Sequence, residues 1–448
     1  MPFDSRELAV FDEALRHLRA GFEHLPATAE VADDIRLRDA LLAAADRLRD
    51  NYPYPHPLYV GQMLKPPHPV ARLAYALAMH INPNNHALDG GRASSAMEKE
   101  SVAGIARMFG WDEHLGHLCG GGTMANFEAL WVSRELAPGR GFAASSQAHY
   151  THSRLSSVLG VPFVAIEADA GGRMNMDALA RALETGDIGT VVATLGTTAS
   201  GRVDPLVEII ELCRRHGARI HVDAAYGGYF VLAGNLGYCT RAAYDAIGGA
   251  DSIVIDPHKH GLQPYGCGCV LFRDPAVGRV YHHDSPYTYF SSGDMHLGEI
   301  SLECSRAGAS AVALWTTMRM LPLERGGEFA RSLETCREGA LALFEALRTD
   351  ARCVPLSAPE LDIVVWAVRA KTATEASARA RAVFEAAATH DLHLALATFP
   401  RAMAEPAAPV DVWDRETIVC LRACLMKAEH HAWLPEILTR MRAAWDEV

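Results

Sequence analysis

Apolar positions near the start of the chain recur at intervals of three or four residues, which predicts helices rather than strands. Leu8, Phe11 and Leu15 form one such series, and a second covers residues 37–48. Three prolines within residues 53–57 then end the helical pattern, because proline lacks the amide hydrogen that a helix interior needs. The chain is therefore expected to begin with helices that are separated from the rest by an irregular segment.

From about residue 100 onward, segments with helical periodicity alternate with short apolar runs typical of strands. The expected strands are residues 142–145, 163–166, 190–195, 219–222, 252–255 and 269–272. The expected helices are residues 99–108, 124–135, 176–183 and 205–216. This alternation predicts an α/β protein with a largely parallel sheet, and such sheets bind ligands beyond the carboxyl ends of their strands.

We expect the chain to divide into three parts. Residues 1–88 form an N-terminal helical segment, residues 89–320 a large domain, and residues 321–448 a smaller C-terminal α+β domain. The polar stretch 81–95 is expected to be a loop, and residues 309–349 a long helical region.

Composition narrows the class of protein. A chain of 448 residues with 49% hydrophobic side chains has ample material for a core, which excludes wholesale disorder. Its formal net charge of −12 argues against nucleic acid or an anionic membrane as the main ligand. No long apolar run or apolar leader occurs, so we expect neither a transmembrane helix nor a secretory signal. The ten cysteines include no CxxC pair, which is typical of reduced thiols in a cytoplasmic protein.

Two charged side chains follow neighbouring predicted strands. Asp223 comes directly after the strand 219–222, and Lys259 follows the strand 252–255. Alone, Lys259 would be a surface lysine and Asp223 a cap or turn residue. Together they provide what pyridoxal phosphate needs, an amine for its aldehyde and a carboxylate that keeps its ring nitrogen protonated. Burial would also lower the pKa of the lysine and favour the reactive free amine.

A phosphate site is expected at the glycine-rich turn before the helix 124–135. Gly122 and Thr123 would present backbone amides and a hydroxyl at a helix N-terminus, which attracts anions. His258 is a candidate donor to the same phosphate, and His149, just past a strand, is a candidate to stack on the cofactor ring. The alternative is that these residues only cap helices or line loops.

The motifs HVDAAY at 221–226 and DPHK at 256–259, supported by GGTMAN at 121–126, give the chain a family likeness. It resembles the group II pyridoxal-phosphate-dependent amino acid decarboxylases, which belong to fold type I, the aspartate aminotransferase superfamily. The resemblance implies a large domain with a mostly parallel seven-stranded sheet, a smaller C-terminal α+β domain and an N-terminal helical segment. It also implies a homodimer with active sites at the interface.

The resemblance assigns roles to individual residues. Lys259 would form the Schiff base and Asp223 would face the ring nitrogen. The other implied cofactor contacts are His149 and Ala225 on the two faces of the ring, Gly122, Thr123 and His258 at the phosphate, and Thr198 as a nearby hydroxyl.

The resemblance implies the substrate contacts less specifically than the cofactor contacts. Arg306 would meet the substrate carboxylate, unless it forms a structural salt bridge. Tyr287, or in second place Tyr289, would return a proton to the substrate carbon, unless both pack at a dimer interface. The side-chain pocket would include Tyr59 and His86, a mixture that leaves aromatic, acidic and diamino acids open.

The expected reaction is decarboxylation of an L-amino acid to an amine and CO₂, through an external aldimine and a quinonoid. The alternatives are a retro-aldol carbon–carbon lyase like the sphingosine-phosphate lyases, and a pyridoxal-phosphate-binding pseudoenzyme. His260 favours the lyase slightly, because aromatic and glutamate decarboxylases usually have Trp after the lysine, whereas this arrangement resembles both the archaeal tyrosine/aspartate decarboxylases and the sphingosine-phosphate lyases. The expected lack of a membrane segment argues against a long-chain lipid substrate, and His149 fits decarboxylation. A metal site is disfavoured, since His149 and His152 lack the spacing of known zinc motifs.

Overall fold

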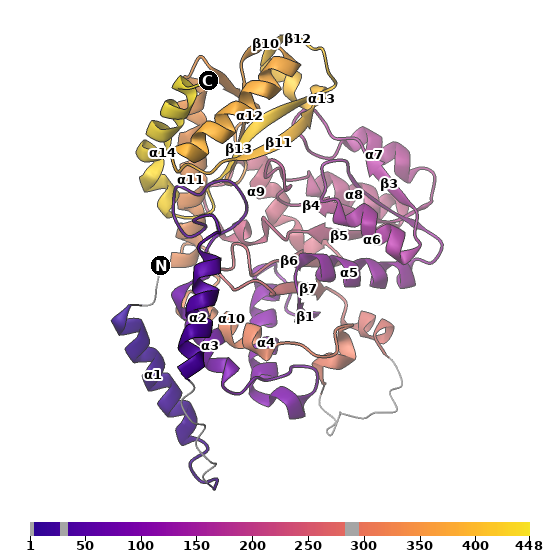
Figure 1. Ribbon diagram of the computed structural model, residues 1–448. Coiled ribbons are helices and arrows are strands. Elements are labelled where there is room, and N and C mark those ends of the chain that lie inside the picture. Colours follow the sequence, from indigo (N-terminus) through magenta and orange to yellow (C-terminus); the bar gives the residue numbers. More distant parts are fainter. Residues whose placement is uncertain (1–3, 27–34, 283–294) are drawn as a thin grey trace.

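The computed structural model describes residues 4–26, 35–282 and 295–448. A seven-stranded sheet lies at its centre (Figure 1). In spatial order the strands are β1 (Leu115–Cys119), β7 (Gly268–Phe272), β6 (Ser252–Ile255), β5 (Arg219–Asp223), β4 (Ile188–Thr194), β2 (Gly141–Ser145) and β3 (Phe163–Ile166). Only β7 runs antiparallel to its neighbours within this sheet. The expected α/β fold with a mostly parallel seven-stranded sheet is therefore confirmed.

Helices flank this sheet and account for its continuous apolar strands. They are α4 (Leu88–Met108), α5 (Gly122–Leu136), α6 (Thr151–Leu159), α7 (Met176–Leu183), α8 (Leu206–His216), α9 (Tyr238–Asp245) and α10 (Gly308–Met320). Every residue of β4 and of β6 is buried, as expected for parallel strands covered on both faces.

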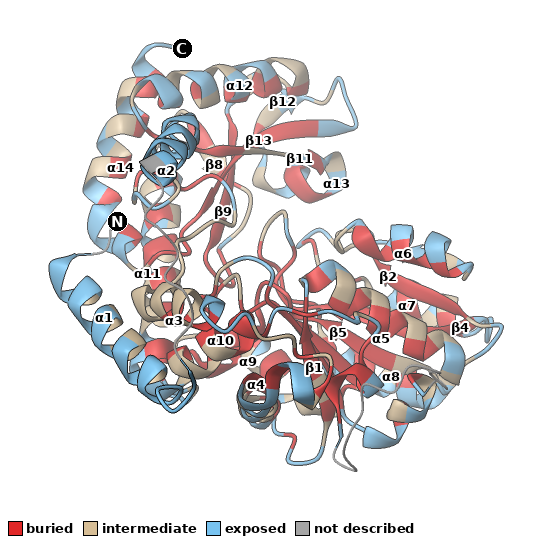
Figure 2. Ribbon diagram, turned by 60° about the horizontal axis from the view of Figure 1, so that its bottom comes forward, coloured by how far each residue is buried: buried red, intermediate tan, exposed pale blue. Residues whose placement is uncertain are grey.

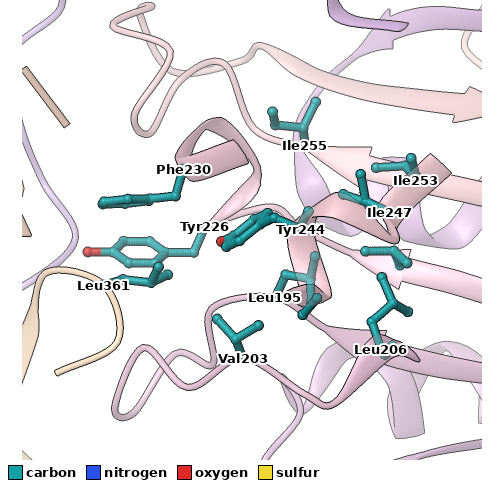
Figure 3. Packing of buried hydrophobic residues seen from close by; sticks show 14 of the residues in the cluster. Leu195, Val203, Leu206, Tyr226, Phe230, Tyr244, Ile247, Ile253, Ile255 and Leu361 are labelled. Atoms are coloured by element: carbon teal, nitrogen blue, oxygen red, sulfur yellow. The ribbon is translucent and has the colours of Figure 1, made fainter. Parts of the chain in front are cut away.

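The main core lies next to the carboxyl ends of the central strands. Figure 3 shows the ring of Tyr226 between Phe230 and Leu361. Because Leu361 precedes a strand of the second sheet, one apolar cluster joins the two sheets. Burial of these large side chains is the main stabilising term at this junction.

The C-terminal part contains an antiparallel sheet of four strands. Their order is β11 (Ala395–Pro400), β13 (Thr417–Cys424), β9 (Ile363–Val368) and β8 (Cys353–Pro355). Beside it, β10 (Ala370–Thr372) pairs with β12 (Val410–Val412). The helices of this part are α11 (Glu328–Arg348), α12 (Ala373–Thr389), α13 (Arg401–Ala404) and α14 (Glu429–Asp446). The boundaries expected at 88/89 and 320/321 stay predictions.

Of the three N-terminal helices, the first two are largely exposed, whereas the third buries Ala71, Ala74 and Ala78 (Figure 2). The helices are α1 (Ser5–Ala20), α2 (Ile35–Leu48) and α3 (Pro69–Met79). The side chains of Asp4 and Glu7 cap the start of α1 reciprocally, but α1 buries none of its residues. Leu37, Leu41 and Leu48 on α2 are each about two thirds exposed (61%, 61% and 67%).

One expectation about local structure is wrong, and another is refined. Residues 88–95 are helical rather than loop, because the small polar side chains of Ser94 and Ser95 are buried and Ser94 hydrogen-bonds to Asn85. The region 309–349 is two helices, since α10 ends at Met320 and α11 begins at Glu328. In addition, β1 was not expected at all. None of the described helices combines the length and apolar character needed to cross a membrane.

Short 3₁₀ turns complete the described structure. They are η1 (Gly228–Leu232), η2 (Ile247–Gly249), η3 (Pro275–Val280), η4 (Leu297–Ile300) and η5 (Glu405–Ala407).

Candidate active site

A cavity of about 730 Å³ opens at the carboxyl ends of β4, β5 and β6. This volume lies within the range usual for small-molecule sites. Eight residues that the sequence pointed to line it: Gly122, Thr123, His149, Thr198, Asp223, Ala225, His258 and Lys259. The topology explains the gathering, because β5 and β6 are adjacent parallel strands whose ends deliver side chains to the same edge.

Asp223 is the last residue of β5 and its carboxylate is buried. Its Oδ2 accepts a hydrogen bond of 2.9 Å from Nε2 of His152, and its Oδ1 accepts one of 3.1 Å from the backbone N–H of Ala225. Burial alone would raise the pKa of Asp223. The donors at His152 and Ala225, with the charge of Lys259, instead hold that pKa well below its usual value. Asp223 is therefore held as an anion.

Lys259 lies on the turn after β6, where its Nζ donates to Oδ2 of Asp256 at 2.9 Å. Burial acts to lower the pKa of Lys259, but the charge and hydrogen bond of Asp256 outweigh it and raise that pKa. The expectation of a depressed lysine pKa is thus wrong for this state of the protein. It overlooked a carboxylate three residues before the lysine.

The turn between β1 and α5 has an unusual backbone that requires glycine. Gly121 has a φ of +146°, a conformation that side chains disfavour. A Cβ on Gly122 would lie 2.7 Å from Oδ2 of Asp256, so a side chain there has no room. No side chain caps the start of α5, and its amides are therefore available to an anion.

The ring of His149 borders the cavity, and its Nδ1 accepts a hydrogen bond from the backbone N–H of Thr151. Burial, followed by the charge of Lys259, lowers the pKa of His149 against the opposing effect of Asp223. A neutral imidazole suits stacking on an electron-poor ring, because it adds no positive charge beside it.

Pyridoxal phosphate fits the residues present. The cavity presents an amine, a buried anion and an uncapped helix start, which match the aldehyde, the ring nitrogen and the phosphate. Nδ1 of His258 is buried without a hydrogen-bond partner in the described part of the chain, and His258 touches the same glycine turn. Such an orphaned polar atom is accounted for by a bound polar ligand.

Three implied substrate residues lie away from the cavity lining. The guanidinium of Arg306 is buried and donates to Oε1 of Glu98 at 2.8 Å and to the carbonyl of Leu118. Tyr59 is buried against Lys427, and His86 packs beside Gly298. The geometry favours the structural salt bridge for Arg306, and the substrate roles of all three stay predictions.

The expected proton donors Tyr287 and Tyr289 lie outside the described residues. His152, considered above only as half of a metal pair, instead contacts Asp223 directly. No sequence signal separated these roles, because a histidine one turn into a helix is usually structural. No group of three or more metal-binding side chains occurs within residues 4–26, 35–282 and 295–448.

Fold and site together define an enzyme that depends on pyridoxal phosphate. A family model described as the pyridoxal-dependent decarboxylase conserved domain matches residues 130–369. The chain belongs to this family, and it is an amino acid decarboxylase, a carboxy-lyase that uses pyridoxal phosphate.

Known relatives agree with this assignment. The chain is 30% identical over 428 residues to an L-tyrosine decarboxylase of Enterococcus faecium, covering 71% of this chain and 70% of that protein. It is 28% identical over 314 residues to a probable L-tyrosine/L-aspartate decarboxylase of Methanothermobacter thermautotrophicus, covering 68% and 82%.

Solved structures share the fold. The structure of mouse CSAD superposes with a TM-score of 0.79 at 20% identity, over 97% of this chain and 92% of that one. Catharanthus roseus tryptophan decarboxylase in complex with L-tryptophan gives a TM-score of 0.76 at 15% identity, over the full length of both chains. At these identities the likeness concerns the fold alone.

Proposed function

We propose that this decarboxylase acts on an aromatic L-amino acid such as tyrosine, releasing CO₂ and the corresponding aryl-ethylamine. The observation that carries the proposal is the composition of the cavity wall. Its described lining holds the carboxylates of Asp223, Asp256 and Glu303 but only one lysine or arginine, Lys259. An acidic side chain would therefore meet no second cation there, whereas an aromatic ring can pack on Phe127 and Leu155.

The name of the Enterococcus faecium relative, an L-tyrosine decarboxylase, supports this choice. Aspartate is the second candidate, because several relatives are named as L-tyrosine/L-aspartate decarboxylases and one as an aspartate 1-decarboxylase.

When bound, pyridoxal phosphate supplies an aldehyde that condenses with amines and a ring that withdraws the electron pair of the broken bond. Lys259 would hold the cofactor before the substrate amine replaces it. Asp223 would keep the ring nitrogen protonated, and the start of α5 would fix the phosphate. The walls of the cavity would turn the carboxylate of the substrate perpendicular to the ring, which selects the bond that breaks.

The proton that replaces CO₂ on Cα would come from Tyr287, with Lys259 as the alternative donor. We expect Tyr287→Phe to release CO₂ but to form amine more slowly, since the carbon that loses CO₂ would have no tyrosine to protonate it. The measurement is a comparison of CO₂ and amine yields over time. Equal amine formation in the variant and the parent would remove Tyr287 from this role, and Tyr289→Phe would then test the second candidate donor in the same way.

The decisive experiment incubates the cofactor-loaded protein with a panel of aromatic, acidic and diamino L-amino acids and quantifies CO₂, amine and aldehyde. Release of CO₂ with tyrosine above aspartate supports the proposal, and the reverse order supports the second candidate. Aldehyde without CO₂ would instead favour the retro-aldol lyase. If neither product forms and borohydride links no cofactor to Lys259, the pseudoenzyme is favoured.

We also propose that the enzyme is a cytoplasmic homodimer. The exposed apolar side chains on α1 and α2, which include Leu8 and Leu41, support a covering second subunit. The ten cysteines are unpaired and most are buried, which supports a reducing compartment. A solution mass of one subunit at working concentration would contradict the dimer.

A further inference from the structure

His152 is the closest side chain to the buried carboxylate of Asp223 that the proposed chemistry does not yet use. It lies in the first turn of α6 and is 1% exposed. Its Nε2 lies 2.9 Å from Oδ2 of Asp223, and a carboxylate can only accept, so Nε2 is the donor. The other ring nitrogen, Nδ1, is buried and has no partner within the described residues. The side chain therefore makes one polar contact of note, and that contact is with Asp223.

A neutral chain of hydrogen bonds also reaches Oδ2 of Asp223, the oxygen that His152 contacts. Nδ2 of Asn126 lies 3.5 Å from Oδ2 of Asp223 and donates to the carbonyl of Gly122 at 2.8 Å. Oδ1 of Asn126 is 2.8 Å from Nε2 of His221, whose Nδ1 is 2.9 Å from the hydroxyl of Ser252. Burial lowers the pKa of His221 to about 3, so this histidine is neutral and its Nε2–H donates to Asn126.

The contacts of Asp223 with Asn126 and with His152 have different effects. Hydrogen bonds to Gly122 and His221 hold the amide of Asn126 in one orientation. The amide therefore helps to fix the position of Asp223, but at 3.5 Å it makes no charge-assisted hydrogen bond of ordinary length with the carboxylate. His152 makes the short bond. Without it, less would oppose the burial of Asp223, so the pKa of its carboxylate would rise and a proton shared with a ring nitrogen would shift toward the carboxylate.

We propose that His152 is a positioning residue that acts through Asp223 to keep the proton on the ring nitrogen of pyridoxal phosphate rather than on the carboxylate. The inference rests on the proposed placement of Asp223 opposite that nitrogen. It predicts that the contribution of His152 to cofactor binding depends on the nitrogen being present.

The test compares two cofactors, pyridoxal phosphate and its 1-deaza analogue, in which C–H replaces the ring nitrogen. Dissociation constants of both are measured for the full-length apoprotein by fluorescence titration. His152→Phe keeps an aromatic ring but loses the donor, and we expect it to weaken pyridoxal phosphate binding by about tenfold or more. The same variant should change the affinity for the deaza analogue by less than about twofold, because that analogue has no proton for Asp223 to hold.

Two further variants separate this role from a packing role. His152→Gln restores an N–H donor of similar reach and should recover most of the discrimination between the two cofactors. His117→Phe is the matched control. It removes a histidine from another buried carboxylate, Glu128, that does not line the cavity, and it should leave the ratio of the two constants unchanged. If His152→Phe does not fold, His152→Met, which also lacks a donor, is read in its place.

Equal weakening of both cofactors in His152→Phe, or no weakening of either, would overturn the proposal. Asp223→Asn tests the underlying assignment separately. If that variant also treats the two cofactors alike, Asp223 does not face the ring nitrogen, and the proposed cofactor arrangement fails rather than the role of His152 alone.

Discussion

At the scale of single residues, each charged member of the site is held by a partner from the surrounding fold, because Asp256 contacts Lys259 and His152 contacts Asp223. Asp223 and Lys259 could be predicted because each follows a recognisable apolar strand and the chemistry of the cofactor needs both. The ion pair between Asp256 and Lys259 could not be predicted, since it depends on the fold of the turn after β6. The bond from His152 to Asp223 joins residues 71 positions apart and was equally invisible.

The ion pair of Lys259 with Asp256 makes a prediction about reactivity. Asp256→Asn keeps the shape of the side chain but removes its charge, so the pKa of Lys259 should fall. The apoprotein should then combine with pyridoxal phosphate faster at neutral pH, because more of the lysine is a free amine. Stopped-flow absorbance across pH measures this change.

The exposed carboxylate of Asp187 provides the control, since Asp187→Asn changes the same net charge away from the site. If both variants give the same pH profile as the parent, Asp256 does not set the basicity of Lys259.

At the scale of elements, apolar periodicity predicted most helices and strands of the large sheet within a few residues. It missed β1, because the segment Leu115–Cys119 is short and includes His117, a polar residue. That histidine is tolerated inside because its Nε2 pairs with Glu128 at 3.0 Å. Periodicity cannot register a buried polar pair whose two members lie on different elements.

The turn that starts α5 makes the prediction at this scale. Gly122→Ala would place a methyl group 2.7 Å from the carboxylate of Asp256 and shift the amides that face the phosphate. We expect the dissociation constant of pyridoxal phosphate to rise on the order of tenfold, since crowding of this kind costs about 1–3 kcal/mol. Equilibrium titration of the apoprotein measures it.

Gly237→Ala is the matched control, because a Cβ at Gly237 meets nothing within 4 Å. Tight binding in both variants would mean that the turn moves without cost.

At the scale of the whole molecule, a buried hydrogen-bonded tie joins the two sheets beside Lys259. Asp362, just before β9, accepts hydrogen bonds of 2.7 Å from the hydroxyl of Tyr226 and 2.8 Å from Nε2 of His260. All three side chains are buried, and Tyr226 and His260 follow the ends of β5 and β6. In the aromatic and glutamate decarboxylases that the chain resembles, the residue after the lysine is usually Trp. Here it is His260, which is part of this tie.

Asp362→Ala should destabilise the protein strongly, because it leaves buried donors without their acceptor. Removing one member of a buried pair costs about 3–5 kcal/mol of unfolding free energy. Denaturant unfolding followed by circular dichroism measures the change. Asp411→Ala, at an exposed position in β12, is the control. A loss below about 1 kcal/mol would mean that the tie adds little to stability.

A buried lysine in the C-terminal part predicts how stability depends on pH. Burial lowers the pKa of Lys427 to about 7, although its Nζ donates to the carbonyls of His56 and Tyr59. Between pH 7 and its unfolded pKa near 10.4, the unfolded chain binds more protons than the native one. Stability from this group therefore rises with pH across that window.

Lys427→Met removes the titration but keeps the bulk of the side chain. The stability of the parent relative to this variant should increase from pH 7 to pH 9.5, as measured by urea unfolding at each pH. A difference that stays constant across these values would show that Lys427 remains protonated in the native protein.

The pairing of β1 has a consequence for how the protein is made. Among the described residues, β1 forms its ladder only with β7, and a Cβ on Gly268 of β7 would lie 2.5 Å from the carbonyl carbon of Gly121. A nascent chain that ends before Gly268 thus has no template for β1 or for the turn after it, and closing so long a loop is slow. On the ribosome, the glycine turn proposed to anchor the cofactor phosphate should therefore form only after β7 has emerged.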